Sequence, residues 1–127
     1  MNPIARQAAI LFCPALCFAG SHQLGQALIL KDAMPVAAIL AKPRPFMGKI
    51  VQVKGKIEEE CQGTICWVSL SDDAGHFLRL DETGGIVFPK ESIGKLAIVE
   101  GKLERRRNDR GKASYRIEGT GAIIFDN

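Results

Sequence analysis

The chain has few of the patterns that mark an enzyme. Its 127 residues include two histidines. They show no serine, histidine and aspartate in the order of a hydrolase, and no glycine-rich loop of the kind that cradles phosphate. No two carboxylates are paired in an evident pocket. We therefore expect a protein that is not an enzyme.

Strong net charge is also missing. The formal net charge is +3, whereas proteins that bind polyanions usually concentrate much more positive charge on one surface. Charge alone therefore does not indicate a nucleic-acid partner. The hydrophobic content of 46% is ordinary for a packed core, and the length suits one small domain with appendages.

The chain lacks an apolar run long enough to cross a membrane. Residues 8–19 are apolar but contain Pro14, and a membrane helix needs about 20 residues. A basic start, a short apolar run and a small residue are typical of an export signal. We interpret residues 1–19 as a signal peptide cut after Ala19, with Ala27 as the alternative last residue, and expect a periplasmic or otherwise exported protein. The alternative is a hydrophobic helix that is retained.

Cysteine is scarce. Of the four cysteines, Cys13 and Cys17 leave with the signal peptide, so that Cys61 and Cys66 remain. A pair of cysteines in an oxidising compartment favours a disulfide, and their spacing at the mouth of a hairpin suits one. We expect this disulfide to clamp the ends of two strands.

A metal site is the alternative use of Cys61 and Cys66. Soft thiolates favour zinc or copper(I), with His76 or a carboxylate such as Glu60 or Asp72 as a further ligand. A strong zinc signature would need a second cysteine pair or two histidines. Thiol exchange has less support, because reactive cysteines usually lie two residues apart at a helix start. No other cofactor is expected.

Two stretches of the chain repeat one phrase, either by duplication or because two strands meet the same demands. Residues 48–58 read GKIVQVKGKIE and residues 94–104 read GKLAIVEGKLE. Apolar and polar residues alternate in the first stretch, as in a half-buried strand. Gly55 and Gly101 occupy inward positions, where a missing side chain lets a strand bend or another strand approach. Such bends let a small sheet coil into a barrel.

The remaining elements are short. We expect a helix over residues 33–42, capped by Asp32, with Val36, Ile39 and Leu40 on its apolar face. Turn residues and alternation predict an edge strand at 27–30 and further strands at 65–71, 76–80, 86–88, 95–104 and 113–125, with a loop at 105–112.

These elements predict an all-β fold: a small OB-like (oligonucleotide/oligosaccharide-binding) coiled barrel of five to six strands with one short N-terminal helix. The usual helix between the third and fourth strands has no room here, and the N-terminal helix takes its place at one barrel end. The expected division is a signal peptide (1–19), an arm with a short helix (20–45) and an OB-like β-barrel (46–127).

Aromatic and basic residues are the candidates for binding a ligand. Trp67, Phe77 and Tyr115 can stack on a flat group, although Trp67 is also explained by packing against the helix or a barrel end. Four arginines stand in the 105–112 loop, which OB barrels often use for nucleic acid: Arg105, Arg106, Arg107 and Arg110. The alternative is a solvated hairpin tip whose cations guard a strand edge. An exported protein rarely meets nucleic acid, so an anionic envelope surface or a protein is the more natural partner.

Three segments resemble a known family. LGQALILKDAMPVAAILAKPRPFMGK, CQGTICW and IVFPKESIGK, in this order, are similar to the exported bacterial family known as domain of unknown function 4920. The resemblance covers residues 25–104, and its most specific part is the Cys61-x4-Cys66-Trp67 motif, which that family follows with Met where this chain has Val68. The resemblance implies a periplasmic or surface OB-like domain with a genuine cysteine pair, and no established activity.

The sequence therefore predicts an exported, non-enzymatic OB-like binding or accessory module of unknown ligand, with a structural Cys61–Cys66 disulfide. A thiol-handling or metal-handling protein is the alternative, and a polyanion-binding or nucleic-acid-binding protein that uses the 105–112 loop is the third hypothesis.

Overall fold

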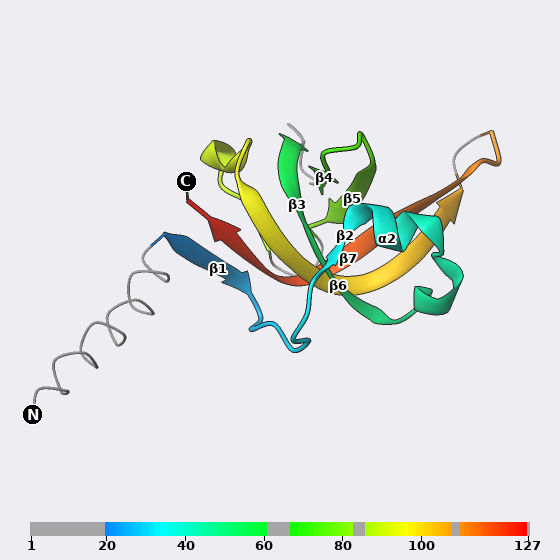
Figure 1. Ribbon diagram of the computed structural model, residues 1–127, viewed down its shortest axis with the longest axis horizontal. Coiled ribbons are helices and arrows are strands. Elements are labelled where there is room, and N and C mark those ends of the chain that lie inside the picture. Colours follow the sequence, from blue (N-terminus) through cyan, green and yellow to red (C-terminus); the bar gives the residue numbers. More distant parts are fainter. Residues whose placement is uncertain (1–19, 61–66, 83–85, 108–109, 127) are drawn as a thin grey trace, which may run out of the picture.

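The computed structural model describes residues 20–60, 67–82, 86–107 and 110–126 as a mostly antiparallel β-sheet with one short α-helix (Figure 1). The strands are β1 (Ser21–Gly25), β2 (Met34–Pro35), β3 (Ile50–Glu60), β4 (Trp67–Ser71), β5 (Phe77–Asp81), β6 (Leu96–Arg107) and β7 (Ala113–Phe125). The other elements are one helix, α2 (Val36–Ala41), and two 3-10 turns, η1 (Arg44–Phe46) and η2 (Lys90–Ser92). None of the helices in the described ranges is long and apolar enough to cross a membrane.

Five of the strands form a closed ring of pairings. β3 pairs with β4, β4 with β5, β5 with β7, β7 with β6, and β6 returns to β3. β5 and β7 run parallel, whereas the other four pairs are antiparallel. Side chains of one face of each strand are buried in a single cluster. The hydrophobic core therefore lies on the inner side of the ring.

The two copies of the repeated phrase pair with each other, as parts of β3 and β6. Val53 lies opposite Val99, the residue that occupies the same position in the other copy. Gly55 lies opposite Ala97, and Val51 lies opposite Gly101. The two copies are therefore related by an approximate twofold axis through the Val53–Val99 pair.

The central glycine of each copy lies where other parts of the chain come very close. A Cβ atom at Gly55 would lie 3.0 Å from the carbonyl oxygen of Ser71 and 3.3 Å from Val36 Cγ2. At Gly101 it would lie 2.1 Å from the carbonyl oxygen of Glu118, at an irregularity of the β6–β7 pairing. The prediction that these glycines permit close approach is confirmed, because no other residue leaves that space free.

An N-terminal arm, residues 26–33, crosses the outer side of the ring and is held there by a buried carboxylate. Glu100 is 1% exposed, although it points outward from β6. Its Oε1 accepts a hydrogen bond from the backbone N–H of Ile29 (2.7 Å), and its Oε2 accepts one from that of Leu30 (2.9 Å). The side-chain amide of Gln52 donates to Leu30 O (2.7 Å) and to Glu100 Oε2 (3.0 Å). The arm is thus fixed to β3 and β6 through polar atoms that it shields from water.

Beyond Glu100 the arm leads into a short strand and the helix. After crossing β6 and β3 it forms β2, which pairs parallel to β3, and then α2, whose Val36 and Ile39 are buried in the core. On the outer face of β5, Phe77 is 56% exposed, whereas Ser69 and Ser71 on the same face of β4 are buried.

Several sequence predictions of the N-terminal part need correction. The helix starts after Pro35, with no side-chain cap, so Asp32 does not cap it and the helix is shorter than 33–42. Residues 27–30 form no strand, because the N–H groups of Ile29 and Leu30 donate to Glu100 instead of a neighbouring strand. The edge strand is β1, which pairs with β7.

Two further boundaries differ downstream. Residues 86–88 alternate in burial as predicted but form no strand, and the N–H of Phe88 donates to Glu82 Oε2 at 2.6 Å. Residues 105–107 belong to β6 and not to a loop, because they pair with residues 113–115. The predicted last strand coincides with β7 residue for residue.

We predict that Glu100→Gln weakens the fold. A glutamine amide places N–H donors against the N–H donors of the arm or of Gln52, and each buried donor without an acceptor costs about 1–3 kcal/mol. The free energy of unfolding, measured by urea titration, should fall by about 3 kcal/mol. Glu104→Gln, at a half-exposed position of the same strand, is the matched control; equal unfolding midpoints for the two variants would contradict the clamp.

Candidate functional site

A hollow of about 410 Å³ is lined by residues of β4, β5 and β7. We call it the face hollow; it is lined by Ser69, Phe77, Arg79, Ser114, Tyr115 and Arg116. Its walls combine two aromatic rings, two guanidinium groups and two hydroxyls. This combination can hold a ligand that has both a flat face and a negative charge.

Strand register brings these residues together. In β5, Leu78 and Leu80 are buried in the core, so Phe77 and Arg79 between and beside them point outward. Arg79 lies opposite Ser69 of β4 and opposite Arg116 of β7, which runs parallel to β5. Residues of β4 and β7 therefore line the same hollow because β5 pairs with both strands.

The two arginines of the face hollow differ in their partners. The guanidinium carbon of Arg79 lies 4.3 Å from the centroid of the Trp67 ring, and no carboxylate of the described residues forms an ion pair with it. Arg116 Nη1 lies 3.4 Å from Asp81 Oδ2, and its buried Nε has no hydrogen-bond partner in the described residues. Stacking on Trp67 orients Arg79 while leaving its N–H groups available to an anion.

Two predicted ligand residues, Phe77 and Tyr115, line the face hollow, and a third, Trp67, is joined to it through Arg79. The predicted arginines do not line it. Arg105 lies opposite Tyr115 on β6, Arg106 and Arg107 follow toward the hairpin tip, and Arg110 is exposed beyond them. Arg106 forms an ion pair with Glu118, with 3.8 Å between Nη2 and Oε2.

The residues predicted from the sequence to bind a ligand did not include Arg79 and Arg116. The alternation of Leu78 and Leu80 placed Arg79 on the outer side, which was a usable signal. Nothing in the sequence indicated the parallel pairing that brings Arg116 beside it.

The cysteine hypotheses fall on residues that the structure does not describe. β3 ends at Glu60 and β4 begins at Trp67, and Cys61 and Cys66 lie in the segment outside the described ranges. His76 lies at the opposite end of β4, in the turn to β5, where its Nδ1 is 2.9 Å from Asp72 Oδ2. The described ranges contain no cluster of three or more metal-binding side chains. The disulfide and the metal site both stay predictions.

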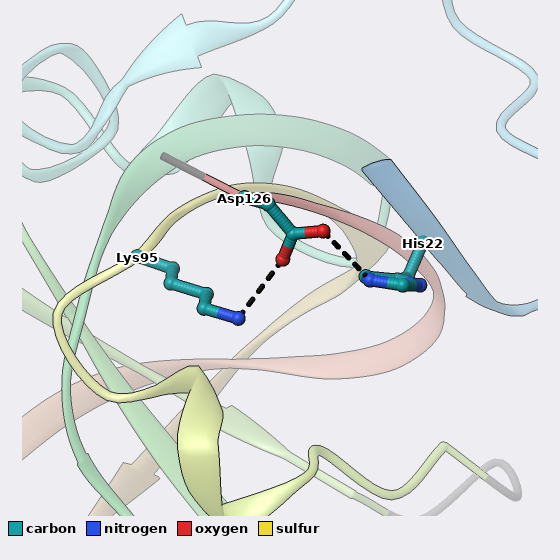
Figure 2. A network of polar contacts seen from close by, with 3 residues as sticks. All are labelled: His22, Lys95 and Asp126. Carbon is teal, nitrogen blue, oxygen red and sulfur yellow. Dashed lines mark hydrogen bonds and ion pairs between the residues drawn. The ribbon is translucent and has the colours of Figure 1, made fainter. Parts of the chain in front are cut away.

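A second polar cluster joins β1 to the C-terminal end of β7 (Figure 2). Asp126 Oδ1 accepts a hydrogen bond from Lys95 Nζ at 2.9 Å, and its Oδ2 lies 2.8 Å from His22 Nε2. Another hollow of about 410 Å³ adjoins it. Because Lys95 and His22 both already contact Asp126, we interpret the cluster as a tether for β1 and not as a ligand site.

Two aspartates of these clusters have lowered pKa values. The hydrogen bond from Lys95 is the main reason that the pKa of Asp126 lies below its ordinary value of 3.8, and the charges of His22 and Lys95 add to it. For Asp72, the backbone N–H of His76 is the main cause of the lowered pKa, with help from the N–H of Ala74.

We predict an acid-dependent contribution from Asp126. Because its pKa is lower in the folded protein than in the unfolded chain, the carboxylate stabilises the fold above pH 3.8 and loses that effect as the pH falls below 3.8. Asp126→Asn should therefore be less stable than the wild type at neutral pH, and urea titrations at falling pH should show the difference shrinking. Asp73→Asn, an exposed change in the β4–β5 turn, is the control; a gap that stays constant with pH would contradict the prediction.

No family model matches the chain, and no curated protein matches it. The resemblance to domain of unknown function 4920 stays a prediction.

Proposed function

We propose that the protein is an exported, non-enzymatic binding module that holds an anionic ligand in the face hollow, and that its five-stranded ring is an OB-like barrel. OB folds are five-stranded and bind their ligands on the face of their second and third strands. β4 and β5 are the second and third strands of the ring in chain order, and both contribute to the face hollow.

The observation that carries the proposal is Arg79. It is stacked on Trp67, points into an open hollow beside Phe77, and has no carboxylate partner in the described residues. A guanidinium group that lies over an aromatic ring and has no carboxylate partner is suited to an anionic ligand. A purely structural arginine at a sheet surface would more naturally pair with a neighbouring carboxylate, as Arg116 does with Asp81.

The position of β1 favours the earlier of the two proposed cleavage sites. This strand begins at Ser21 and pairs with β7 over five residues. A cut after Ala27 would remove it together with the His22–Asp126 contact, whereas a cut after Ala19 leaves it intact. We therefore propose that residues 1–19 are the signal peptide.

The disulfide is the second part of the proposal. The Glu60–Val68 pair joins the strand ends that precede Cys61 and follow Cys66. A short closed loop at this place would contribute roughly 2 kcal/mol by the chain-entropy estimate. It would hold the start of β4, and with it Trp67, against β3.

We predict that calorimetric titration with trigalacturonate, a short acidic sugar chain, gives binding, whereas neutral maltotriose does not bind. Arg79→Ala should weaken this binding at least about tenfold, because a hydrogen bond to a charged group contributes about 1.5–3 kcal/mol. Lys90→Ala, an exposed cation on η2, is the matched control. Equal affinity for wild type and Arg79→Ala, or equal binding of the neutral sugar, would refute the proposal.

We also predict the mass of the mature protein. A chain that begins at Gly20 and has lost the two hydrogen atoms of a disulfide should be found by intact mass spectrometry after expression with its leader. Reduction should restore those hydrogens and make Cys61 and Cys66 reactive. Two reactive thiols before reduction, or a stoichiometric metal in the native protein, would support the thiol or metal hypothesis instead.

A further inference from the structure

A second hollow lies next to Tyr115. It measures about 470 Å³ and is lined by Ala41, Lys42, Pro43, Arg44, Pro45 and Tyr115. We call it the proline hollow. Because Tyr115 also lines the face hollow, the two hollows are neighbours that share this residue.

Tyr115 is the residue that the two hollows share. It is half-buried and packs against the hydrophobic core. Its strand, β7, pairs with β6 on one side, and Arg105 stands directly opposite Tyr115 on that strand. A ligand that passes from one hollow to the other therefore meets an aromatic ring with a cation beside it.

The wall of the proline hollow is stiff before any ligand arrives. Pro43 and Pro45 restrict the backbone, and η1 is closed by hydrogen bonds from Phe46 N to Pro43 O (3.0 Å) and from Met47 N to Arg44 O (3.2 Å). The segment that follows is tied to β6 by the bond from Gly48 N to Leu103 O (2.9 Å). A preformed wall loses little conformational entropy on binding.

Each hollow has cationic side chains among its lining residues. Lys42 and Arg44 are exposed at the proline hollow, and neither forms an ion pair with the other described residues. Arg79 plays the same part in the face hollow. A ligand that satisfies both hollows thus needs negative charges at separated points along its length.

We infer that the ligand is an anionic polysaccharide whose chain runs from the face hollow across Tyr115 into the proline hollow. This inference rests on the proposed function and adds to it a second subsite and a polymer class. Sugar rings have flat C–H faces that suit Phe77, Tyr115 and the prolines, and their hydroxyls suit the exposed Ser114.

The same features argue against single-stranded nucleic acid as the occupant. Such ligands bind by stacking successive bases on exposed aromatic rings along a continuous positive groove. Of Trp67, Phe77 and Tyr115, Phe77 is the one that is well exposed, and Arg79 covers one face of Trp67. The cations are interrupted by Asp81 and Glu118, which pair with Arg116 and Arg106. Sparse charge favours a polymer whose charges are spaced by hydroxyl-bearing units.

The test is a length series of oligogalacturonates titrated by calorimetry into the full mature protein. Wild-type affinity should rise by roughly a hundredfold from the shortest chain to chains that reach both hollows, because the second contact becomes intramolecular. The double variant Lys42→Ala/Arg44→Ala should bind the shortest chain like wild type and gain little with length. Lys31→Ala/Lys90→Ala, with two exposed cations removed elsewhere, is the control, and thermal unfolding confirms that each variant is folded.

The outcomes separate this inference from the proposed function. Binding of short chains that depends on Arg79 but gains nothing with length refutes the second subsite and leaves the proposed function standing. Tighter binding of oligothymidylate than of any oligogalacturonate, with a steep salt dependence, refutes the polysaccharide. No binding of any acidic probe refutes both. The single tryptophan, Trp67, offers an independent fluorescence signal for occupation of the face hollow.

Discussion

The carboxylate of Glu100 is the interaction on which the rest of this architecture depends. It lies on the outer side of β6, where a charge would ordinarily face water, yet it is buried because the N-terminal arm lies over it. Its oxygens accept N–H donors from Ile29, Leu30 and Gln52, so that the buried charge has the hydrogen bonds it needs. The arm thereby covers the side of the ring that carries Glu100.

The face hollow gains its chemistry from strand order. Residues on β4, β5 and β7 become neighbours because β5 pairs antiparallel on one edge and parallel on the other. Arg79 therefore has Ser69 beside it on one strand and Arg116 on the other. The stacked arginine, the exposed Phe77 ring and Tyr115 then lie on rigid strands, which favours a site that is formed before its ligand arrives.

Local patterns in the sequence were sufficient to predict much of this fold. Period-two alternation gave β7 its bounds and the β3 and β6 phrases their inward glycines, because burial on one face of a strand leaves a periodic trace. Non-local contacts leave no such trace. Alternation places Glu100 toward solvent, and only the crossing arm reverses that. Residues 105–107 looked like a charged loop, but pairing with 113–115 made them part of a strand. Arg116 could be assigned to a site only once the parallel pairing was known.

The approximate twofold relation between the two copies of the phrase has a kinetic consequence. Val53 and Val99 are direct partners although a large part of the chain separates them, so the two copies cannot pair with each other until the second has been made, whereas β3 can pair with β4 earlier. The β4–β5 and β6–β7 hairpins join residues near in sequence and can form early, whereas pairing of β3 with β6 carries the loop-closure entropy of everything between them. Closure of the ring is therefore expected to be the late, rate-limiting event of folding, with the apolar face of β3 exposed until it occurs.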